Sequence, residues 1–195
     1  MLIRDKGKDN TMTEPYNKVP IYYEPEEGEI NLDIGAGILP LAGFEHVDVK
    51  DFPHIEHVVD VLTEGLPFVE NDAVAHIYSS HFLEHITWRG AGTILTEFHK
   101  KLKKGGTLEL HLPNFPIIIK EYMKTLEGLQ DKDKILNRWK MQNELFGMQS
   151  TPYEFHTGAY DGILLKQLLS DIGFRAVKLL DNKIDATDLS VGAVK

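Results

Sequence analysis

The stretch INLDIGAG, residues 30–37, decides the fold expected for this chain. A short apolar run passes through Asp33, and a turn containing Gly35 and Gly37 follows at once. This pattern is typical of a buried parallel strand that ends in a tight turn. Four more strand-like runs follow along the chain, at residues 44–49, 57–61, 73–80 and 106–113.

Helix-like segments alternate with these runs. Apolar residues recur at the spacing of one helix face over residues 92–102. A long helical stretch is expected over 116–148, with a break into two helices at Gly128 and the DKDK run. A last helix is expected over 162–170, and the final strands over 174–180 and 188–194. The alternation of strands with helices predicts the α/β class.

Length and composition exclude several classes of protein. A chain of 195 residues, 42% of them hydrophobic, suits one domain with a real core. The absence of cysteine excludes disulfide scaffolds, thiolate metal sites and thiol nucleophiles. A net charge of −9 argues against a broad nucleic-acid surface, so no nucleic-acid partner is expected.

The chain also lacks the marks of a membrane or secreted protein. No apolar run approaches the roughly 20 residues that span a bilayer. The N-terminal residues lack the apolar block of a secretory signal. We therefore expect no membrane partner and a cytoplasmic location.

We expect two parts in the chain. Residues 1–28 are polar and contain three prolines, which predicts a flexible leader that becomes an extended arm near residues 19–23. Residues 29–195 are expected to form a single domain. Within it, the apolar segment at 116–150 is an insertion that either covers the site as a lid or forms a homodimer interface.

Acidic residues mark the ends of the first three expected strands, at Asp33, Asp48 and Asp60. Ligands of open parallel sheets bind beyond the carboxyl ends of the strands, so these carboxylates are expected to converge on one edge. Each one alone could instead cap a following helix. Three together favour an acidic rim, which needs a ligand with several donors or a positive charge.

The turn after the first strand bears on the kind of ligand. A dinucleotide-binding fold has G-x-G-x-x-G opening a helix that faces a pyrophosphate. Here the sequence is GAGILP, with Pro40 where the third glycine would stand, and the next strand follows so soon that the intervening helix must be very short or absent. A cationic, phosphate-free nucleoside fits better, and S-adenosylmethionine is such a compound.

Six segments in their order resemble the class I S-adenosylmethionine-dependent methyltransferases: LDIGAG, VDV, DVLTEGLPF, YSSHFLEHI, EFHKKLKKGGTLELHLPN and LLSDIGF. The resemblance is greatest to small members with a short first crossover, and it covers about residues 30–180. It implies a Rossmann-like, mostly parallel seven-stranded sheet with one antiparallel strand and helices on both faces. It also implies S-adenosylmethionine as the cofactor.

The resemblance further implies that ten residues at the ends of the first four strands bind the cofactor. They are Asp33, Gly35, Ala36, Gly37, Asp48, Val49, Asp60, Val61, Ser79 and Ser80. The first four would face the methionine part. Asp48 would accept hydrogen bonds from the ribose, and Asp60 would bind the adenine amino group beside the backbone of Val61. The two serines would lie beneath the departing methyl.

Histidines are the candidates for catalysis, because a hydroxyl or amine acceptor can need a base and histidine is the commonest one. His81 and His85 follow the fourth strand, and His156 lies in a polar and aromatic loop before the last helix. These three are the candidate catalytic residues, although each could serve packing or capping instead. His111 and Asn114, at the end of the fifth strand, would also be in range of an acceptor.

A second group of histidines could be interpreted as a metal site. His46, His54 and His57 lie close together in the sequence, around the second and third expected strands. No carboxylate spacing accompanies them, so we expect surface histidines there and no bound metal in the protein.

The leading hypothesis is an enzyme that transfers a methyl group from S-adenosylmethionine to an oxygen, or less readily a nitrogen, of a small-molecule or saccharide acceptor. One alternative is a nicotinamide-dependent oxidoreductase on the same type of sheet. Another is a methyltransferase-like protein that binds ligands without catalysis, because a fold does not guarantee a function.

Overall fold

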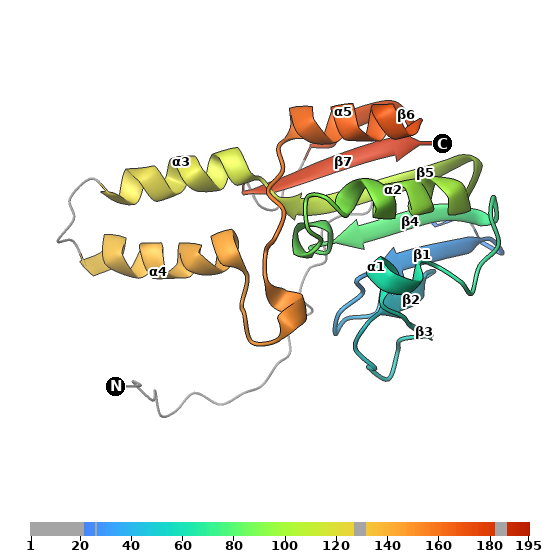
Figure 1. Ribbon diagram of the computed structural model, residues 1–195, viewed down its shortest axis with the longest axis horizontal. Coiled ribbons are helices and arrows are strands. Elements are labelled where there is room, and N and C mark those ends of the chain that lie inside the picture. The colour runs from blue at the N-terminus through green and yellow to red at the C-terminus, as the bar shows by residue number, and fades with distance from the viewer. Residues whose placement is uncertain (1–21, 26, 127–131, 182–186) are drawn as a thin grey trace.

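The computed structural model describes residues 22–25, 27–126, 132–181 and 187–195. Seven strands form one sheet in the order β3-β2-β1-β4-β5-β7-β6 (Figure 1). The strands are β1 Ile30–Ile34, β2 Glu45–Asp48, β3 His57–Val58, β4 Val74–Ser80, β5 Leu102–Pro113, β6 Arg175–Leu179 and β7 Asp188–Val194. Strand β7 runs antiparallel to β5 and β6, and the pairs among β1 to β5 are parallel. The expected mixed α/β sheet with one antiparallel strand is confirmed.

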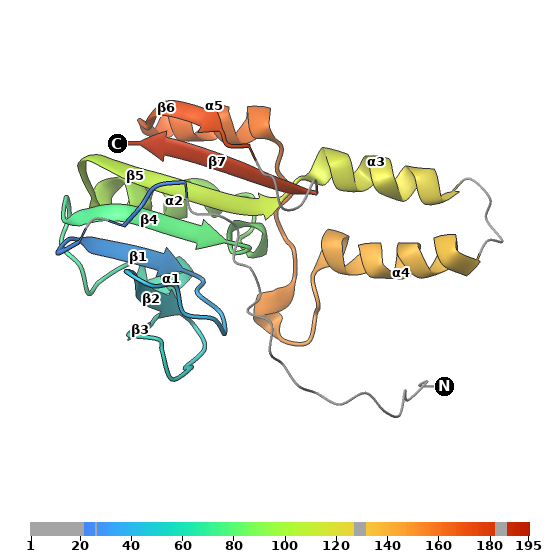
Figure 2. The ribbon, with the colours of Figure 1, turned by 180° about the vertical axis from the view of Figure 1, so that it is seen from behind.

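The helices and short 3₁₀ turns lie in two groups. They are α1 Val61–Glu64, η1 Leu83–His85, α2 Ala91–Lys101, α3 Phe115–Leu126, α4 Lys132–Phe146, η2 Pro152–Glu154 and α5 Gly162–Ile172. Figures 1 and 2 show α1, α2 and α5 on one face of the sheet, while α3 and α4 project side by side beyond the edge where the parallel strands end.

Two expected segments are only partly covered by the described residues. The helical insertion is present as α3 and α4, whereas the expected break at Gly128 lies outside the described residues. Most of the expected leader, residues 1–21 and 26, also lies outside them. Within the described residues, no helix is both long enough and apolar enough to span a membrane.

The third expected strand is shorter than the sequence predicts. The strand covers only His57–Val58, because Asp60 caps a helix instead of continuing the strand. The Asp60 side chain accepts a hydrogen bond from the Leu62 backbone N–H, which satisfies one free donor of the first helical turn. As a result the chain turns away from the sheet directly after residue 60.

The apolar core lies between the sheet and the helices on its first face. Leu108, Leu110 and Leu112 alternate along β5 and are fully or almost fully buried. Leu95 and Phe98 of α2 belong to the same buried cluster. The apolar residues that alternate along the strand therefore pack against the apolar residues of one helix face, as the sequence pattern predicts.

The second face of the sheet differs from the expectation of helices on both faces. In the part of the chain that the structure describes, no helix lies on this face, because β1 connects to β2 through turns alone. Many of the buried side chains on its strands are polar, beside a small separate apolar cluster of Leu41, Phe44 and Tyr78. The most buried of the polar side chains are Asn31, Asp33, His76, Glu109, His111 and Ser190.

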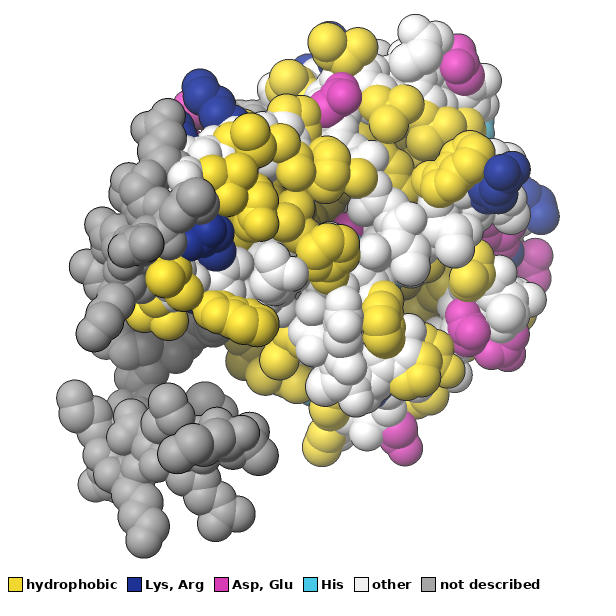
Figure 3. Space-filling model, turned by 60° about the vertical axis from the view of Figure 1, so that its left-hand side comes forward, with side chains coloured by type: hydrophobic (Ala, Val, Ile, Leu, Met, Phe, Trp, Pro, Cys, Tyr) yellow, Lys and Arg dark blue, Asp and Glu magenta, His cyan; other side chains and the backbone are white. Residues whose placement is uncertain are grey.

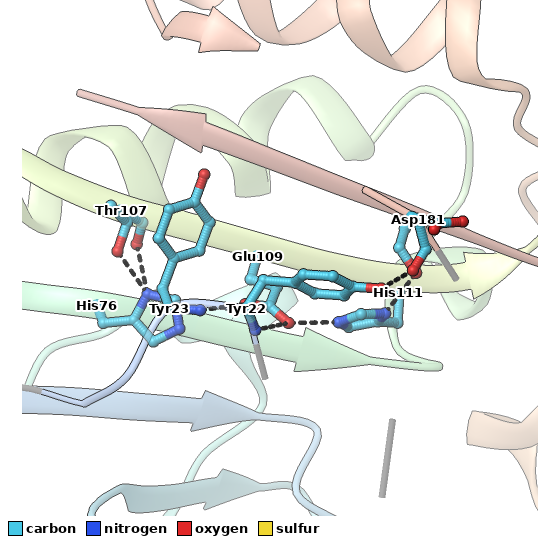
Figure 4. Close-up of polar contacts among 8 residues, drawn as sticks. Tyr22, Tyr23, His76, Thr107, Glu109, His111 and Asp181 are labelled. Carbon is cyan, nitrogen blue, oxygen red and sulfur yellow. Dashed lines mark hydrogen bonds and ion pairs between the residues drawn. The ribbon is translucent and has the colours of Figure 1, made fainter. Parts of the chain in front are cut away.

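A network of hydrogen bonds ties the N-terminal arm to this polar face (Figure 4). The carboxylate of Glu109 accepts hydrogen bonds from the backbone N–H groups of Tyr22, at 2.9 Å, and Tyr23, at 3.2 Å. The same carboxylate lies 2.6 Å from His111 Nε2, and His111 Nδ1 lies 2.7 Å from the Ser190 hydroxyl. These contacts satisfy a buried carboxylate that would otherwise be costly.

We expect the buried, neutral His76 to make the folding stability depend on pH. Burial lowers the pKa of His76, whose ring lies beside Thr107, Tyr23, Phe44 and the Glu109 carboxylate. The unfolded chain takes up a proton below a pH of about 6.5 that the folded chain resists. Stability should therefore fall as the pH drops through this window, by up to about 1.4 kcal/mol per pH unit.

Urea denaturation of wild type and His76→Gln between neutral and mildly acidic pH measures this effect. The variant should lose part of the acid-dependent decline. Parallel pH profiles for the two proteins would contradict the assignment. His57→Gln, at a half-buried histidine near the protein surface, is the matched control.

Candidate functional site

A cavity of about 530 Å³ opens at the carboxyl ends of β1, β2 and β3. This volume lies within the range of small-molecule sites. Its wall includes Gly35 and Gly37 from the turn after β1, and Asp48 and Val49 from the end of β2. Asp60 and Val61, where β3 gives way to α1, complete this side. Six of the ten residues predicted to bind a cofactor therefore line one cavity.

The turn after β1 depends on positive backbone angles and on close packing. Gly35 has a φ of +72°, and a side chain there would come within 2.8 Å of the Phe82 Cβ atom. Gly37 has a φ of +63°, with nothing within 4 Å of an added Cβ. Both angles favour glycine. The first glycine allows Phe82 to pack on the turn, and the second keeps the backbone open to a ligand.

Asp48 joins the loops after β1 and β2. One carboxylate oxygen accepts a hydrogen bond of 2.9 Å from the Gly37 backbone N–H, and the other accepts one of 2.8 Å from the Lys50 N–H. Each oxygen keeps a second lone pair for a ligand. Asp60 is similar to Asp48, because one of its oxygens caps α1 and the residue also lines the cavity.

Four of the predicted cofactor residues do not line the cavity: Asp33, Ala36, Ser79 and Ser80. Asp33 is 2% exposed and points to the second face of the sheet, opposite to Leu32 and Ile34. It has a polar partner within the protein. The Ser79 hydroxyl donates to the Ile34 carbonyl across the β1–β4 pair, at 3.1 Å.

His81 lies at the end of β4 and lines the cavity. Its φ of +52° is unusual for a residue other than glycine and turns the ring away from the strand direction. Its Nδ1 lies 3.2 Å from Glu84 Oε1, and its Nε2 lies 3.5 Å from Asp188 Oδ2. Burial works to lower the pKa of His81, but contacts with the Asp188 and Glu84 carboxylates outweigh it and raise the pKa to about 10. A ring that keeps its proton at neutral pH suits a donor better than a base.

His85 and His156 come together although they are far apart in the sequence. Their rings are 5.0 Å apart between centroids and inclined by 68°. Burial lowers the pKa of His156. His85 lines the cavity, whereas His156 lies behind it, next to His85. The structure therefore brings the three candidate catalytic histidines to one end of the cavity, around the side chain of Glu84.

His54 Nε2 lies 3.0 Å from the carbonyl of Gly37, which lines the cavity, whereas three other histidines have roles away from this site. His46 is 6% exposed rather than on the surface as predicted, because its Nε2 accepts from the Leu41 N–H while its Nδ1 contacts Glu56. His57 stacks on Phe68 at 3.6 Å, and His111 belongs to the polar network of the second face.

Asn114, the other residue considered for acceptor contact, donates its backbone N–H to the Thr187 carbonyl at 2.7 Å. It also forms an isolated bridge with Tyr160. Its backbone therefore links the end of β5 to the segment that precedes α5, and it does not line the cavity described above.

The mouth of the cavity is bounded by the start of the polar and aromatic loop, in which the sequence singled out only His156. Pro152, Tyr153 and Glu154 of η2 line the cavity from the side opposite the strands. Glu154 pairs with Lys50 at 2.8 Å. Hydrogen bonds from Lys50 and Ser150 lower the pKa of Glu154 to about 2. No local motif marks these residues, because their contact with β2 arises only from the path of the insertion.

Hydrophobic side chains gather over α3 and α4 on the side of the molecule shown in Figure 3. The most exposed of these are Met123, Leu136 and Trp139, and the last is 72% exposed. An exposed apolar surface of this kind commonly marks an interaction site. It lies beyond the strand ends, next to the segment that bounds the cavity.

Comparison with known proteins gives matches only among solved structures. No protein-family profile matches the sequence, and no curated protein matches it. A SAM-dependent methyltransferase from Archaeoglobus fulgidus is 16% identical, with a TM-score of 0.56 and 86% of each chain covered. A SAM-dependent methyltransferase from Aquifex aeolicus is 13% identical, with a TM-score of 0.51 over 88% of this chain and 84% of the other.

A third match carries bound ligands. The 1,6-didemethyltoxoflavin-N1-methyltransferase of Burkholderia thailandensis, solved with 1,6-didemethyltoxoflavin and S-adenosylhomocysteine, is 13% identical. Its TM-score is 0.52, over 85% of this chain and 70% of that one. At these identities the likeness establishes the fold, which is the Rossmann-like fold of these methyltransferases.

Replacing Gly35 with alanine should destabilise the protein by about 1–3 kcal/mol, because the new Cβ adds a clash with Phe82 to an unfavourable φ. Gly37→Ala is the matched control, since it has the same kind of φ without a clash. Chemical denaturation of both variants measures the difference. Equal losses of stability in the two variants would show that Phe82 does not press on the turn.

The Lys50–Glu154 ion pair is expected to hold η2 over the cavity. Glu154→Gln should increase amide hydrogen exchange in residues 150–155 severalfold, with little change in global stability, because ion pairs near the protein surface contribute little to it. Glu121→Gln, which removes an ion pair on α3, is the control and should leave this segment unchanged. Unaltered exchange in Glu154→Gln would mean that the pair does not restrain η2.

Proposed function

We propose that this protein binds S-adenosylmethionine in the cavity and transfers its methyl group to an oxygen, or less readily a nitrogen, of a small-molecule or saccharide acceptor. The main support is the cavity at the ends of β1, β2 and β3, where Asp48 and Asp60 present carboxylates beside the open turn at Gly37. Its occurrence in a fold shared with SAM-dependent methyltransferases adds to this support.

The chemistry of the cavity suits this cofactor. Lys50 is engaged by Glu154, and His81 lies between Glu84 and Asp188, so the positive charges near the cavity already have partners. Asp48 and Asp60 accept hydrogen bonds from backbone N–H groups. A ligand with positive charge and hydroxyl donors would balance these two carboxylates, and S-adenosylmethionine has both and carries no phosphate.

The roles proposed for individual residues follow from their positions. Asp48 would accept hydrogen bonds from ribose hydroxyls, and Asp60 would contact the adenine beside Val61. The open backbone at Gly37 would permit a close approach of the methionine part. For Asp33, Ser79 and Ser80, which lie outside the cavity lining, direct contact would require movement of the surrounding backbone.

Positioning is the main task of the protein in methyl transfer, since the thioether that leaves needs no acid. Correct alignment alone can lower a barrier by roughly 7–11 kcal/mol. A protonated His81 would donate to the cofactor or the acceptor. His85 and His156 remain the candidates for a base, because each has one ring nitrogen directed at a backbone carbonyl and one left for another partner.

The nicotinamide alternative finds less support in the structure. A pyrophosphate needs the N-terminus of a helix that follows β1. The connection from β1 to β2 contains only turns, so it offers no helix N-terminus to bind a phosphate. A non-catalytic binding protein remains the second candidate, because it would share every feature of the cavity.

The acceptor would approach from the side of α3, α4 and η2. The apolar side chains on these elements suit either a lid over a partly apolar acceptor or a homodimer interface. No nucleic-acid or membrane partner is proposed. The cytoplasmic location stays a prediction of the sequence.

Calorimetric titration with S-adenosylhomocysteine tests the proposal. Wild type should bind one equivalent, and Asp60→Asn should weaken binding by roughly 10- to 100-fold, because a charged acceptor contributes about 1.5–3 kcal/mol. Asparagine preserves the helix cap, so the variant should fold normally. Asp72→Asn, at an exposed aspartate paired with Lys195, is the control.

Two outcomes would argue against the proposal. One is the absence of binding by wild type at millimolar ligand, and the other is binding of NADH in its place. Transfer of labelled methyl groups to a panel of hydroxyl and amine acceptors then separates an enzyme from a protein that only binds the cofactor.

A further inference from the structure

We propose that Glu84, His85 and His156 form a binding site for a divalent transition-metal ion such as Zn²⁺, at the inner end of the cavity. One ligand atom from each residue lies within 4.8 Å of the other two. The sequence predicts no metal site, because His156 is remote from the other two residues along the chain. The fold alone brings them together.

The hydrogen bonds of both histidines leave one ring nitrogen of each available for metal ligation. His85 Nδ1 lies 3.2 Å from the Phe155 carbonyl oxygen, and His156 Nδ1 lies 3.0 Å from the Glu144 carbonyl oxygen. A carbonyl can only accept, so each Nδ1 carries the hydrogen and each Nε2 keeps its lone pair. Metal-bound histidines characteristically donate their second ring N–H to a carbonyl or carboxylate in this way.

Glu84 is the second, independent sign of a ligand. Its side chain is 2% exposed, and in the described part of the chain only one of its two carboxylate oxygens, Oε1, has a partner, in the ion pair with His81. His81 Nδ1 approaches only one of them, at 3.2 Å. A buried carboxylate is costly unless its oxygens are satisfied. A cation between Glu84 and the two imidazoles would satisfy the remaining oxygen.

Backbone hydrogen bonds hold the ligands in place. The Glu84 carbonyl accepts from the Thr157 N–H at 2.7 Å and from the Gly158 N–H at 2.9 Å. The Thr157 hydroxyl donates to the His85 carbonyl at 2.9 Å, and the His156 N–H donates to the Phe146 carbonyl at 3.1 Å. The segment that carries His156 is thus fixed against η1 on one side and the end of α4 on the other. Such prior ordering lowers the cost of binding an ion.

The donor set indicates the class of ion. Two imidazole nitrogens and one carboxylate oxygen suit Zn²⁺ and similar first-row ions, whereas Mg²⁺ and Ca²⁺ prefer oxygen ligands alone. Zinc bonds of about 2.0–2.2 Å require only small movements of side chains that already lie this close. Three protein ligands leave at least one coordination position for a further ligand.

The site has a consequence for the acceptor, which rests on the proposed methyltransferase function. His85 lines the cavity, so an ion bound to it would face the same space. An acceptor hydroxyl could occupy the free coordination position, where the ion would favour loss of its proton to solvent, and the ion would then replace His85 and His156 in the role of a base. This favours a hydroxyl-bearing acceptor over an amine.

The experiment uses the full chain, freed of metal with a chelator and titrated with Co²⁺ as a spectroscopic probe for Zn²⁺. One equivalent of Co²⁺ should give visible absorption bands of a low-coordinate, nitrogen-bound ion, and Zn²⁺ should displace it. His85→Ala and His156→Ala should each weaken binding at least about tenfold. The matched control is His99→Gln, a histidine packed on Phe174 outside the site, which should bind as wild type does.

Glu84→Gln keeps the side-chain volume and removes the charge, and it should also weaken binding. Circular dichroism confirms that each variant is folded, and His156→Ala keeps the test decisive if a substitution at buried Glu84 disturbs folding. The absence of a one-to-one complex in wild type would overturn the proposal. Equal affinity in wild type and the two histidine variants would overturn it as well.

Titration of the same metal-free samples with S-adenosylhomocysteine tests cofactor binding separately. Failure of the metal site with retained cofactor binding is thereby distinguished from failure of the proposed function. The metal readout depends on neither the methyl donor nor the acceptor, so each result applies to one hypothesis alone.

Discussion

Parallel pairing of β1 with β2 on one side and with β4 on the other is the constraint on which the site depends. It places the ends of these strands at one edge, so Gly35, Asp48 and His81 approach the same space although they lie far apart in the chain. The link between β1 and β2 is short, and Asp48 at the end of β2 accepts a hydrogen bond from the Gly37 N–H within it, where a longer link would have held a helix.

The missing helix also explains the polar second face of the sheet. With only turns between β1 and β2, no described helix covers that face, and an apolar surface there would meet solvent. The strands instead carry Glu109, His111 and Ser190, whose polar atoms are satisfied by one another and by the backbone of Tyr22 and Tyr23. A segment of extended chain thus does part of the covering that a helix would do (Figure 4).

The insertion is coupled to the site through its return to the sheet rather than through its helices. After α4 the chain passes along η2, pairs Glu154 with Lys50, and then fixes Thr157 and Gly158 to the Glu84 carbonyl. Movement of α3 and α4 would therefore reach the cavity through residues 150–158. Residues 150–158 therefore contain both the part of the chain that bounds the cavity and His156, which lies behind it.

The sequence by itself determined the α/β class, nearly every strand, and six residues that line the cavity, because period-two runs, glycine turns and strand-end aspartates are local signals. It did not show that the Asp33 side chain lies outside the cavity lining, because alternation along β1 sends that side chain to the second face. It could not predict the ion pair between Glu154 and Lys50, or the position of His156 beside Glu84 and His85. Those contacts depend on the path of the insertion through space, and only tertiary structure decides where residues so distant in the chain meet.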